Sequence, residues 1–84
     1  METFIILGKW TPQGIAKVKE APARIEAVRK ATEAAGGKMV AWYLTFGRYD
    51  FVVISEAPDA RAAARLLLAN GAQGNASSET LHAL

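Results

Sequence analysis

Two apolar segments that flank a glycine constrain the fold more than any other feature of this sequence. KMVAWYLTF covers residues 38–46, and YDFVVISE covers residues 49–56. Their β-branched and aromatic residues predict two strands, and Gly47-Arg48 between them predicts a tight hairpin turn. Successive side chains of a strand point to opposite faces of a sheet, and here both sets are apolar. Both faces of the predicted hairpin therefore need cover.

The segment before the hairpin predicts a strand and then a helix. TFIILGKW at 3–10 has the composition of a strand, and Thr11-Pro12 after it is typical of an N-cap followed by proline in the first helical turn. Apolar residues at helical spacing continue to about residue 35. Pro22 lies inside this span, which predicts either a kink or a short helix followed by a longer one.

The segment after the hairpin predicts a second helix and a last strand. Pro58-Asp59 begins the helical pattern PDARAAARLLLAN, and Gly71 ends it. Residues 75–84 have a weak, polar strand pattern, which predicts a strand that lies at the edge of a sheet or is only partly paired. The element order is therefore β-α-β-β-α-β in one domain, residues 1–84. We predict an α+β, ferredoxin-like fold with a four-stranded antiparallel sheet.

This topology predicts an assembly as well as a fold. Two helices on one side of a sheet cover only one of its faces. The simplest cover for the second face is another copy, so we predict a dimeric α+β barrel, as a homodimer or a higher even-numbered oligomer. The chain has 84 residues, 51% of them hydrophobic, and no cysteine. A domain this small and without disulfides gains core by association.

The composition argues against several classes of function. The absence of cysteine excludes disulfides, thiolate chemistry and Cys-based zinc sites, and we expect no metal and no cofactor. No apolar run approaches the length of a membrane span and no signal peptide is apparent, which predicts a cytoplasmic protein. The net charge is only +2. The basic residues of the first helix are mixed with acidic ones, so we interpret them as a solvated face rather than a nucleic-acid site: Lys17, Lys19, Arg24, Arg29 and Lys30.

Three polar segments are expected to meet at one end of the sheet. They are the end of the first strand, the hairpin turn and the start of the last strand. The first helix also begins at this end, and its free N–H groups favour an anion. The candidate ligand-binding residues from these segments are Lys9, Trp10, Arg48, Tyr49, Asp50 and Asn75.

Each candidate also has a structural interpretation. A tight turn requires a residue such as Gly47, and Arg48 at the tip of a turn is most simply solvated. The two aromatic candidates suit packing positions. Asp50 begins an otherwise hydrophobic strand, so it either pairs with Arg48 or Lys9, or contacts a ligand or acts as a base.

His82 is the only histidine, and we interpret it as a surface residue. Its strand parity is opposite to that of Glu79, so the two side chains do not share a face. Within one subunit it lies roughly 23 Å along the last strand from the Asp50 end. A metal site is poorly supported by this pattern.

The sequence resembles the GYD-domain family of small bacterial and archaeal proteins. The resemblance rests on GKWTPQGIAKVKEAPARIEA at 8–27, GRYDFVVISEAPD at 47–59, and ANGAQGN followed by ETL ending at Leu81. The motif that names the family corresponds to Gly47, Tyr49 and Asp50. The resemblance implies a ferredoxin-like fold with dimeric α+β barrel assembly, and it implies no substrate.

Three hypotheses for function follow. The first is a homo-oligomeric module that binds an organic anion or an aromatic metabolite, with charge from Arg48 and Lys9, stacking area from Trp10 and Tyr43, and polar selection from Asp50 and Asn75. The second is a small enzyme without metal, an isomerase or cofactor-independent oxygenase, with Asp50 or His82 as base and Tyr49 as acid. The third is a structural motif that fixes the hairpin and the subunit interface. The sequence favours the first hypothesis, because it has a cluster typical of a binding site but no full catalytic set.

Overall fold

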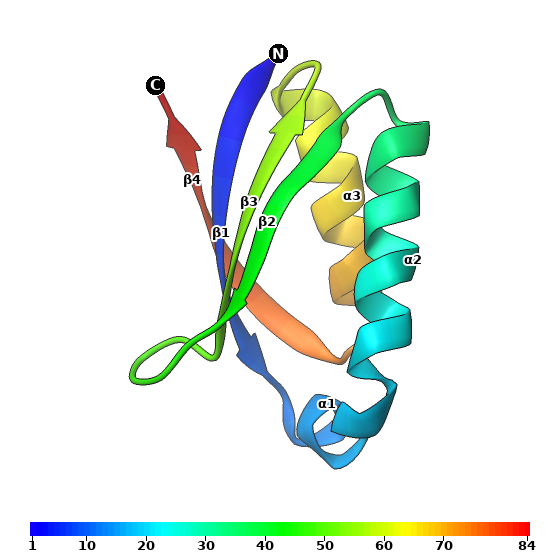
Figure 1. The fold of residues 1–84 in the computed structure, drawn as a ribbon, viewed down its shortest axis with the longest axis vertical. Coiled ribbons are helices and arrows are strands. Elements are labelled where there is room, and N and C mark those ends of the chain that lie inside the picture. The colour runs from blue at the N-terminus through cyan, green and yellow to red at the C-terminus, as the bar shows by residue number, and fades with distance from the viewer.

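The computed structural model describes residues 1–84 and contains one four-stranded antiparallel sheet with its helices on one side (Figure 1). The strand order is β2-β3-β1-β4, so the first strand is central. The elements are β1 (Glu2–Trp10), α1 (Pro12–Ala16), the 3-10 helix η1 (Val18–Glu20), α2 (Ala21–Ala34), β2 (Lys38–Leu44), β3 (Phe51–Ala57), α3 (Ala60–Ala72) and β4 (Ala76–Ala83). The predicted α+β, ferredoxin-like fold is confirmed.

The first helical segment is divided, as the proline inside it predicts. α1 ends at Ala16, η1 follows, and Pro22 lies in the first turn of α2. A proline there leaves no hydrogen bond unmade, because the first N–H groups of a helix have no partner within the helix. None of the helices is long and apolar enough to cross a membrane.

The start of α1 is tied to the connection that precedes β4. The Thr11 hydroxyl accepts a hydrogen bond from the Gly14 N–H at 3.0 Å and donates one to the Gly74 carbonyl at 2.6 Å. The Thr11 N–H donates to the Asn75 carbonyl at 3.1 Å. A Cβ at Gly14 would lie 1.8 Å from that same carbonyl oxygen, so this close approach of two backbones requires glycine.

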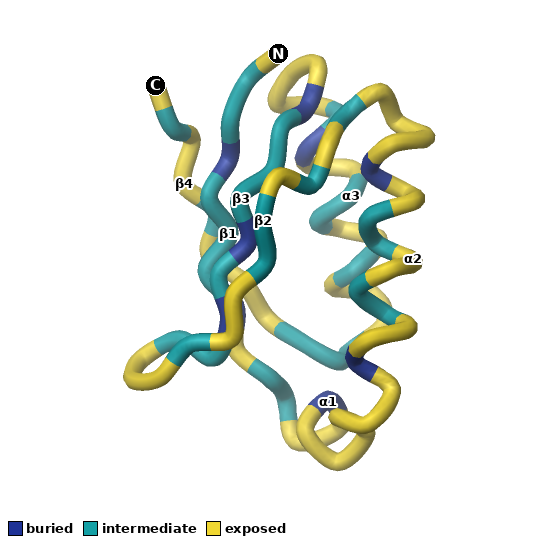
Figure 2. Tube along the Cα trace, viewed as in Figure 1, coloured by how far each residue is buried: buried dark blue, intermediate teal, exposed yellow.

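One face of the sheet packs against α2 and α3, but the packing is incomplete (Figures 1 and 2). Only nine of the 84 residues are buried, and no large side chain is fully buried. The buried cluster consists of Phe4, Ala57 and Ala63, near the end of the sheet where β3 leads into α3. The same three residues also line a cavity between the helices and the sheet.

The opposite face of the sheet has no second layer, and we call it the open face. Its apolar residues alternate with those that face the helices and are Ile5, Leu7, Tyr43, Val52, Ile54 and Leu81. Tyr43 is 57% exposed and Leu81 is 45% exposed. The prediction that both faces are apolar and that the helices cover only one is confirmed. The second copy expected on the open face stays a prediction.

The β2–β3 hairpin differs from the tight turn that the sequence predicts. β2 ends at Leu44 and β3 begins at Phe51, so residues 45–50 form a longer connection. It is closed by the Thr45 N–H, which donates to the Asp50 carbonyl at 2.9 Å. Gly47 has a φ of 93°, so glycine is required here as predicted. Phe46 at the tip is fully exposed, because the connection projects away from the sheet (Figure 1).

Alanine at two helical glycines should change stability in opposite directions. Gly14→Ala should lower the free energy of unfolding by about 1–3 kcal/mol, because its Cβ has no space beside Asn75. A Cβ at Gly71 in α3 would have no atom within 4 Å, so Gly71→Ala should raise the free energy of unfolding by about 0.5–1 kcal/mol. Urea unfolding followed by circular dichroism measures both. Equal effects of the two substitutions would contradict the docking of α1 against residue 75.

Candidate functional site

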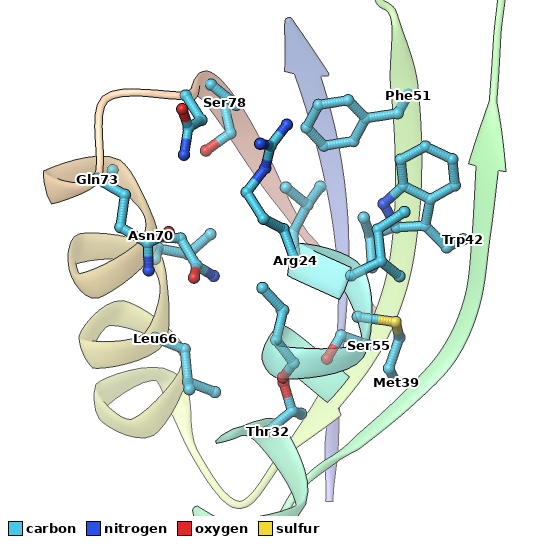
Figure 3. Close-up of a pocket in the computed structure, with 18 of the residues that line it drawn as sticks. Arg24, Thr32, Met39, Trp42, Phe51, Ser55, Leu66, Asn70, Gln73 and Ser78 are labelled. Carbon is cyan, nitrogen blue, oxygen red and sulfur yellow. The ribbon is translucent and has the colours of Figure 1, made fainter. Parts of the chain in front are cut away.

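A cavity of about 200 Å³ lies between the sheet and the long helices α2 and α3 (Figure 3). Of the 24 residues that line it, 15 are hydrophobic. An engineered apolar cavity of about 150 Å³ is known to hold a benzene molecule. The space therefore suits a small organic molecule with one ring or a branched apolar body.

Three aromatic rings form the sheet wall of the cavity. The Phe51 ring lies between Trp10 and Trp42, with ring centroids 4.9 and 5.4 Å away. The Phe51 ring covers Gly8, its partner in the β1–β3 register, and a Cβ at Gly8 would lie 2.1 Å from the ring. The missing side chain of Gly8 thus lets Phe51 lie flat over the central strand. The result is a broad aromatic surface that can contact a ligand ring.

A β-bulge decides which residues of β2 face this cavity. The β2–β3 register shifts between Met39 and Ala41, so Val40 is an extra residue. Met39 and Trp42 consequently both line the cavity, although strict alternation puts them on opposite faces (Figure 3). Tyr43 lies on the open face. The predicted stacking contribution of Tyr43 is therefore not available in this cavity, and Trp42 takes that position.

Arg24 is the one charged residue that lines the cavity. Its Nη1 donates to the Lys17 carbonyl at 3.1 Å, and its guanidinium carbon lies 6.0 Å from the Trp10 ring centroid. Its Nη2 is buried and has no hydrogen-bond partner. Figure 3 shows the side chain directed into the cavity between Phe51 and Ser78.

The position of Arg24 corrects the sequence interpretation. The mixed charges of the first helix predict a solvated position for Arg24, yet Arg24 lies on the inward stripe of α2 with Ala21, Ile25, Val28 and Thr32. These residues are spaced three or four apart in the sequence, which is the pattern of one helix face. This spacing indicates that Arg24 faces the sheet. A buried donor without a partner destabilises a folded chain by about 1–3 kcal/mol, and more when it is charged.

The helix wall and one end of the cavity carry neutral polar groups. Asn70 and Gln73, at the end of α3, face the aromatic wall across the cavity (Figure 3). Asn75 also lines the cavity, but its Oδ1 accepts a hydrogen bond from Gln13 Nε2 at 3.1 Å. The same Gln13 amide donates to the Gln73 carbonyl at 3.1 Å, which ties α1 to this end.

Asp50 has a structural partner that sequence reasoning did not identify. Its Oδ2 accepts a hydrogen bond from the Trp10 N–H at 2.9 Å, and its own N–H donates to the Gly8 carbonyl at 2.8 Å. The regular β1–β3 pairing ends at Gly8 and Phe51. Asp50 therefore extends the bonding of β1 by one more residue through its carboxylate, and neither Arg48 nor Lys9 is its partner. This bond fixes Trp10 at the edge of the cavity.

Tyr49 and Lys9 lie on the open face. The Tyr49 hydroxyl donates to Glu79 Oε2 on β4 at 2.6 Å. That hydrogen bond to a carboxylate, together with partial desolvation, raises the pKa of Tyr49 above its ordinary value. Lys9, Tyr49 and Glu79 line a shallow depression beside Leu7. Arg48 is exposed on the hairpin connection.

His82 lies at the far end of the sheet, as predicted. Its Nε2 is 3.0 Å from Glu2 Oε1, and its ring stacks on Phe4 at 4.7 Å.

The structure divides the six predicted site residues into two groups. Trp10 and Asn75 line the cavity and Asp50 holds Trp10 in place, whereas Lys9, Tyr49 and Arg48 lie on the open face or the hairpin.

Comparison with known proteins identifies the family. Residues 4–84 match the model of the GYD domain. The chain belongs to the GYD domain family. A relative from Thermus thermophilus is 38% identical over 100% of this chain and 90% of its own length, and it is called a glutamine synthetase and cystathionine beta-lyase binding protein.

Solved structures share the fold of this GYD domain at low sequence identity. A feast or famine regulatory protein from M. tuberculosis, complexed with L-methionine, is 18% identical with a TM-score of 0.75. The match covers 100% of this chain and 50% of the regulator, so the GYD chain spans about half its length. A solved structure from Thermus thermophilus is 19% identical with a TM-score of 0.62, over 100% of this chain and 94% of its own. At these identities the likeness shows the fold alone.

The three residues that name the GYD family act here as anchors of the hairpin. Gly47 adopts the positive φ of the connection, Tyr49 bonds to β4, and Asp50 bonds to β1. The hairpin is therefore joined to two different strands through the consecutive residues Tyr49 and Asp50. The motif borders the cavity through Trp10 and does not line it.

Asp50→Ala should lower the free energy of unfolding by about 1–3 kcal/mol, because the Trp10 N–H loses its acceptor. Asp50→Asn should lower it by less, since an amide oxygen can still accept this hydrogen bond. Arg48→Ala is the control and should stay within about 0.5 kcal/mol of the unmodified chain. Chemical denaturation measures all three. A loss for Arg48→Ala equal to that for Asp50→Ala would instead indicate an ion pair between these residues.

Proposed function

We propose that this GYD domain is a small homo-oligomeric binding module whose ligand is an organic anion or an aromatic metabolite. The observation that carries the proposal is the cavity of about 200 Å³, with an aromatic wall, a single cation and neutral amides. Sites for small organic ligands have this composition: a mostly apolar lining with a few polar groups that fix orientation. Lys9 and Arg48 do not line the cavity. They can contribute to binding only where a second copy brings them next to the ligand.

A second copy on the open face completes the proposal. Ile5, Leu7, Val52 and Ile54 form a continuous apolar strip on adjacent central strands. A sheet packed against the same strip of another copy would bury these residues in an isologous contact. The low number of buried residues in one chain, nine of 84, supports this assembly, because a chain with so small a core gains stability by association.

The cavity lining supports binding over catalysis. It contains no aspartate, glutamate, histidine, lysine or tyrosine, so it offers no side chain suited to act as a general base at neutral pH. The residues considered for that role lie elsewhere: Asp50 is bonded to the Trp10 N–H, and His82 pairs with Glu2 at the far end of the sheet.

The relative at 38% identity supports a second candidate function. Its name describes a protein that binds two enzymes, so this chain could act by docking on enzymes of the same kind. The exposed hairpin tip with Phe46 is the surface that a second copy on the open face leaves available for that contact. Purified glutamine synthetase and cystathionine beta-lyase from the same organism, titrated against the chain by biolayer interferometry, test this candidate directly.

Ligand binding in the cavity is tested with two matched tryptophan variants of α3. Leu66 lines the cavity, whereas Leu68 on the same helix is 75% exposed. A panel of phenylacetate, phenylacetamide, 3-phenylpropionate and indole-3-acetate should contain a compound that raises the melting temperature. At ten times its Kd the ligand adds about 1.4 kcal/mol, which corresponds to roughly 6–11 °C for a domain of this size.

Leu66→Trp should abolish this rise, because the indole ring occupies the cavity, and Leu68→Trp should retain it. Circular dichroism confirms that both variants are folded. A rise that survives Leu66→Trp would place the ligand outside the cavity. No rise with any compound of the panel would contradict the proposal for small aromatic ligands.

A further inference from the structure

The guanidinium group of Arg24 is the one charged group among the residues that line the cavity. It comes from the inward stripe of α2, and its Nη1 is held by the Lys17 carbonyl at 3.1 Å. The face of Trp10 lies near it, with 6.0 Å between the guanidinium carbon and the ring centroid. The side chain is directed into the cavity (Figure 3), and its Nη2, which is shielded from solvent, has no hydrogen-bond partner.

The charge of Arg24 is not balanced by any residue around it. None of the 24 lining residues is acidic, and Arg24 is the only charged one. The ion pairs of the chain lie elsewhere, between Arg29 and two glutamates of α2. A guanidinium group stays charged in a protein, so the cavity presents one uncompensated positive charge in mostly apolar surroundings.

The number and kind of donors select the anion. One guanidinium, with the N–H groups that the Lys17 carbonyl does not use, matches the single charge and planar oxygens of a carboxylate. A phosphate carries more charge and needs more donors, and the lining offers no second cation and no array of glycine N–H groups for it. A carboxylate paired with a guanidinium in apolar surroundings gains from the low local dielectric.

The remaining walls define the rest of the ligand. The rings of Trp10, Phe51 and Trp42 form an apolar surface next to Arg24, in which the Trp10 ring is tilted by 45° against Phe51. Across the cavity, the side-chain amides of Asn70 and Gln73 can donate to or accept from a polar substituent (Figure 3). The volume of about 200 Å³ limits the apolar body to about one ring.

We infer that the ligand of this chain is a small monocarboxylic acid with a single aromatic ring or a branched apolar body, bound through its carboxylate to Arg24. This inference rests on the proposed function, because it specifies the ligand of the same cavity. It also replaces Arg48 and Lys9 by Arg24 as the residue that supplies the charge.

The test compares phenylacetate with phenylacetamide, which has nearly the same shape but no charge. Isothermal titration calorimetry at neutral pH should give a Kd for phenylacetate that is at least about tenfold lower than for phenylacetamide in the unmodified chain. Arg24→Met should reduce this ratio to about one, since the apolar methionine keeps the volume of the arginine stem. Arg24→Lys should keep part of the preference, because an ammonium retains the charge but not the planar donors.

Arg29→Met is the matched control on the same helix. Arg29 is half-exposed and already paired with Glu26 and Glu33, so its substitution should leave the ratio unchanged. If Arg24→Met does not fold, the ratio in the unmodified chain and in Arg24→Lys still tests the inference.

The outcomes separate this inference from the proposed function. Binding of both compounds with equal Kd would overturn the carboxylate assignment and leave a cavity for neutral aromatic ligands. A preference for the acid that survives Arg24→Met would overturn the assignment of the charge to Arg24, because another cation would then supply it. Failure of the unmodified chain to bind phenylacetate, phenylacetamide or the other aromatic compounds would count against the proposed function itself.

Discussion

The structure depends on how one short chain covers a four-stranded sheet whose two faces are both apolar. The two long helices lie on one face, and even there they leave a cavity rather than a packed core. The other face, with Ile54 and Leu7 on its central strands, has no layer within the chain. Both the cavity and the open face thus arise from the same shortage of covering residues. The ligand and the second copy that we propose would supply what one chain lacks.

The GYD motif connects these two regions of the molecule. Asp50 holds the backbone of Trp10, whose ring belongs to the aromatic wall and lies beside the guanidinium of Arg24. Tyr49, the adjacent residue, bonds to Glu79 on the open face. The open face and the cavity wall are therefore linked through two consecutive residues. The motif serves as an anchor of the hairpin, and ligand chemistry is assigned to residues outside it.

The sequence was sufficient to predict the fold because its signals are local. Thr11-Pro12 and the internal proline Pro22 mark the helix boundaries, and the apolar alternation of the strands marks their faces. The site was predicted only in part, because its residues are sorted by features that a sequence pattern does not reveal. The bulge at Val40 turns Trp42 towards the helices and leaves Tyr43 outside.

Asp50 and Arg24 show two further limits of sequence reasoning. The partner of Asp50 is a backbone N–H forty residues away, which no side-chain pattern records. Arg24 is one of several basic residues in this helical segment, and only its place on the helical stripe distinguishes it from Arg29. An arginine at a position on the apolar face of a predicted helix, such as Arg24, is therefore the sequence pattern that indicates a charge directed into the protein.

A native mass spectrum of freshly purified protein tests the account most directly, because it reports the assembly and any retained ligand together. The account predicts an even-numbered oligomer that carries a discrete additional mass, no larger than that of a one-ring organic acid, on each chain. A stable monomer without additional mass would contradict it, since neither the open face nor the cavity would then have an occupant.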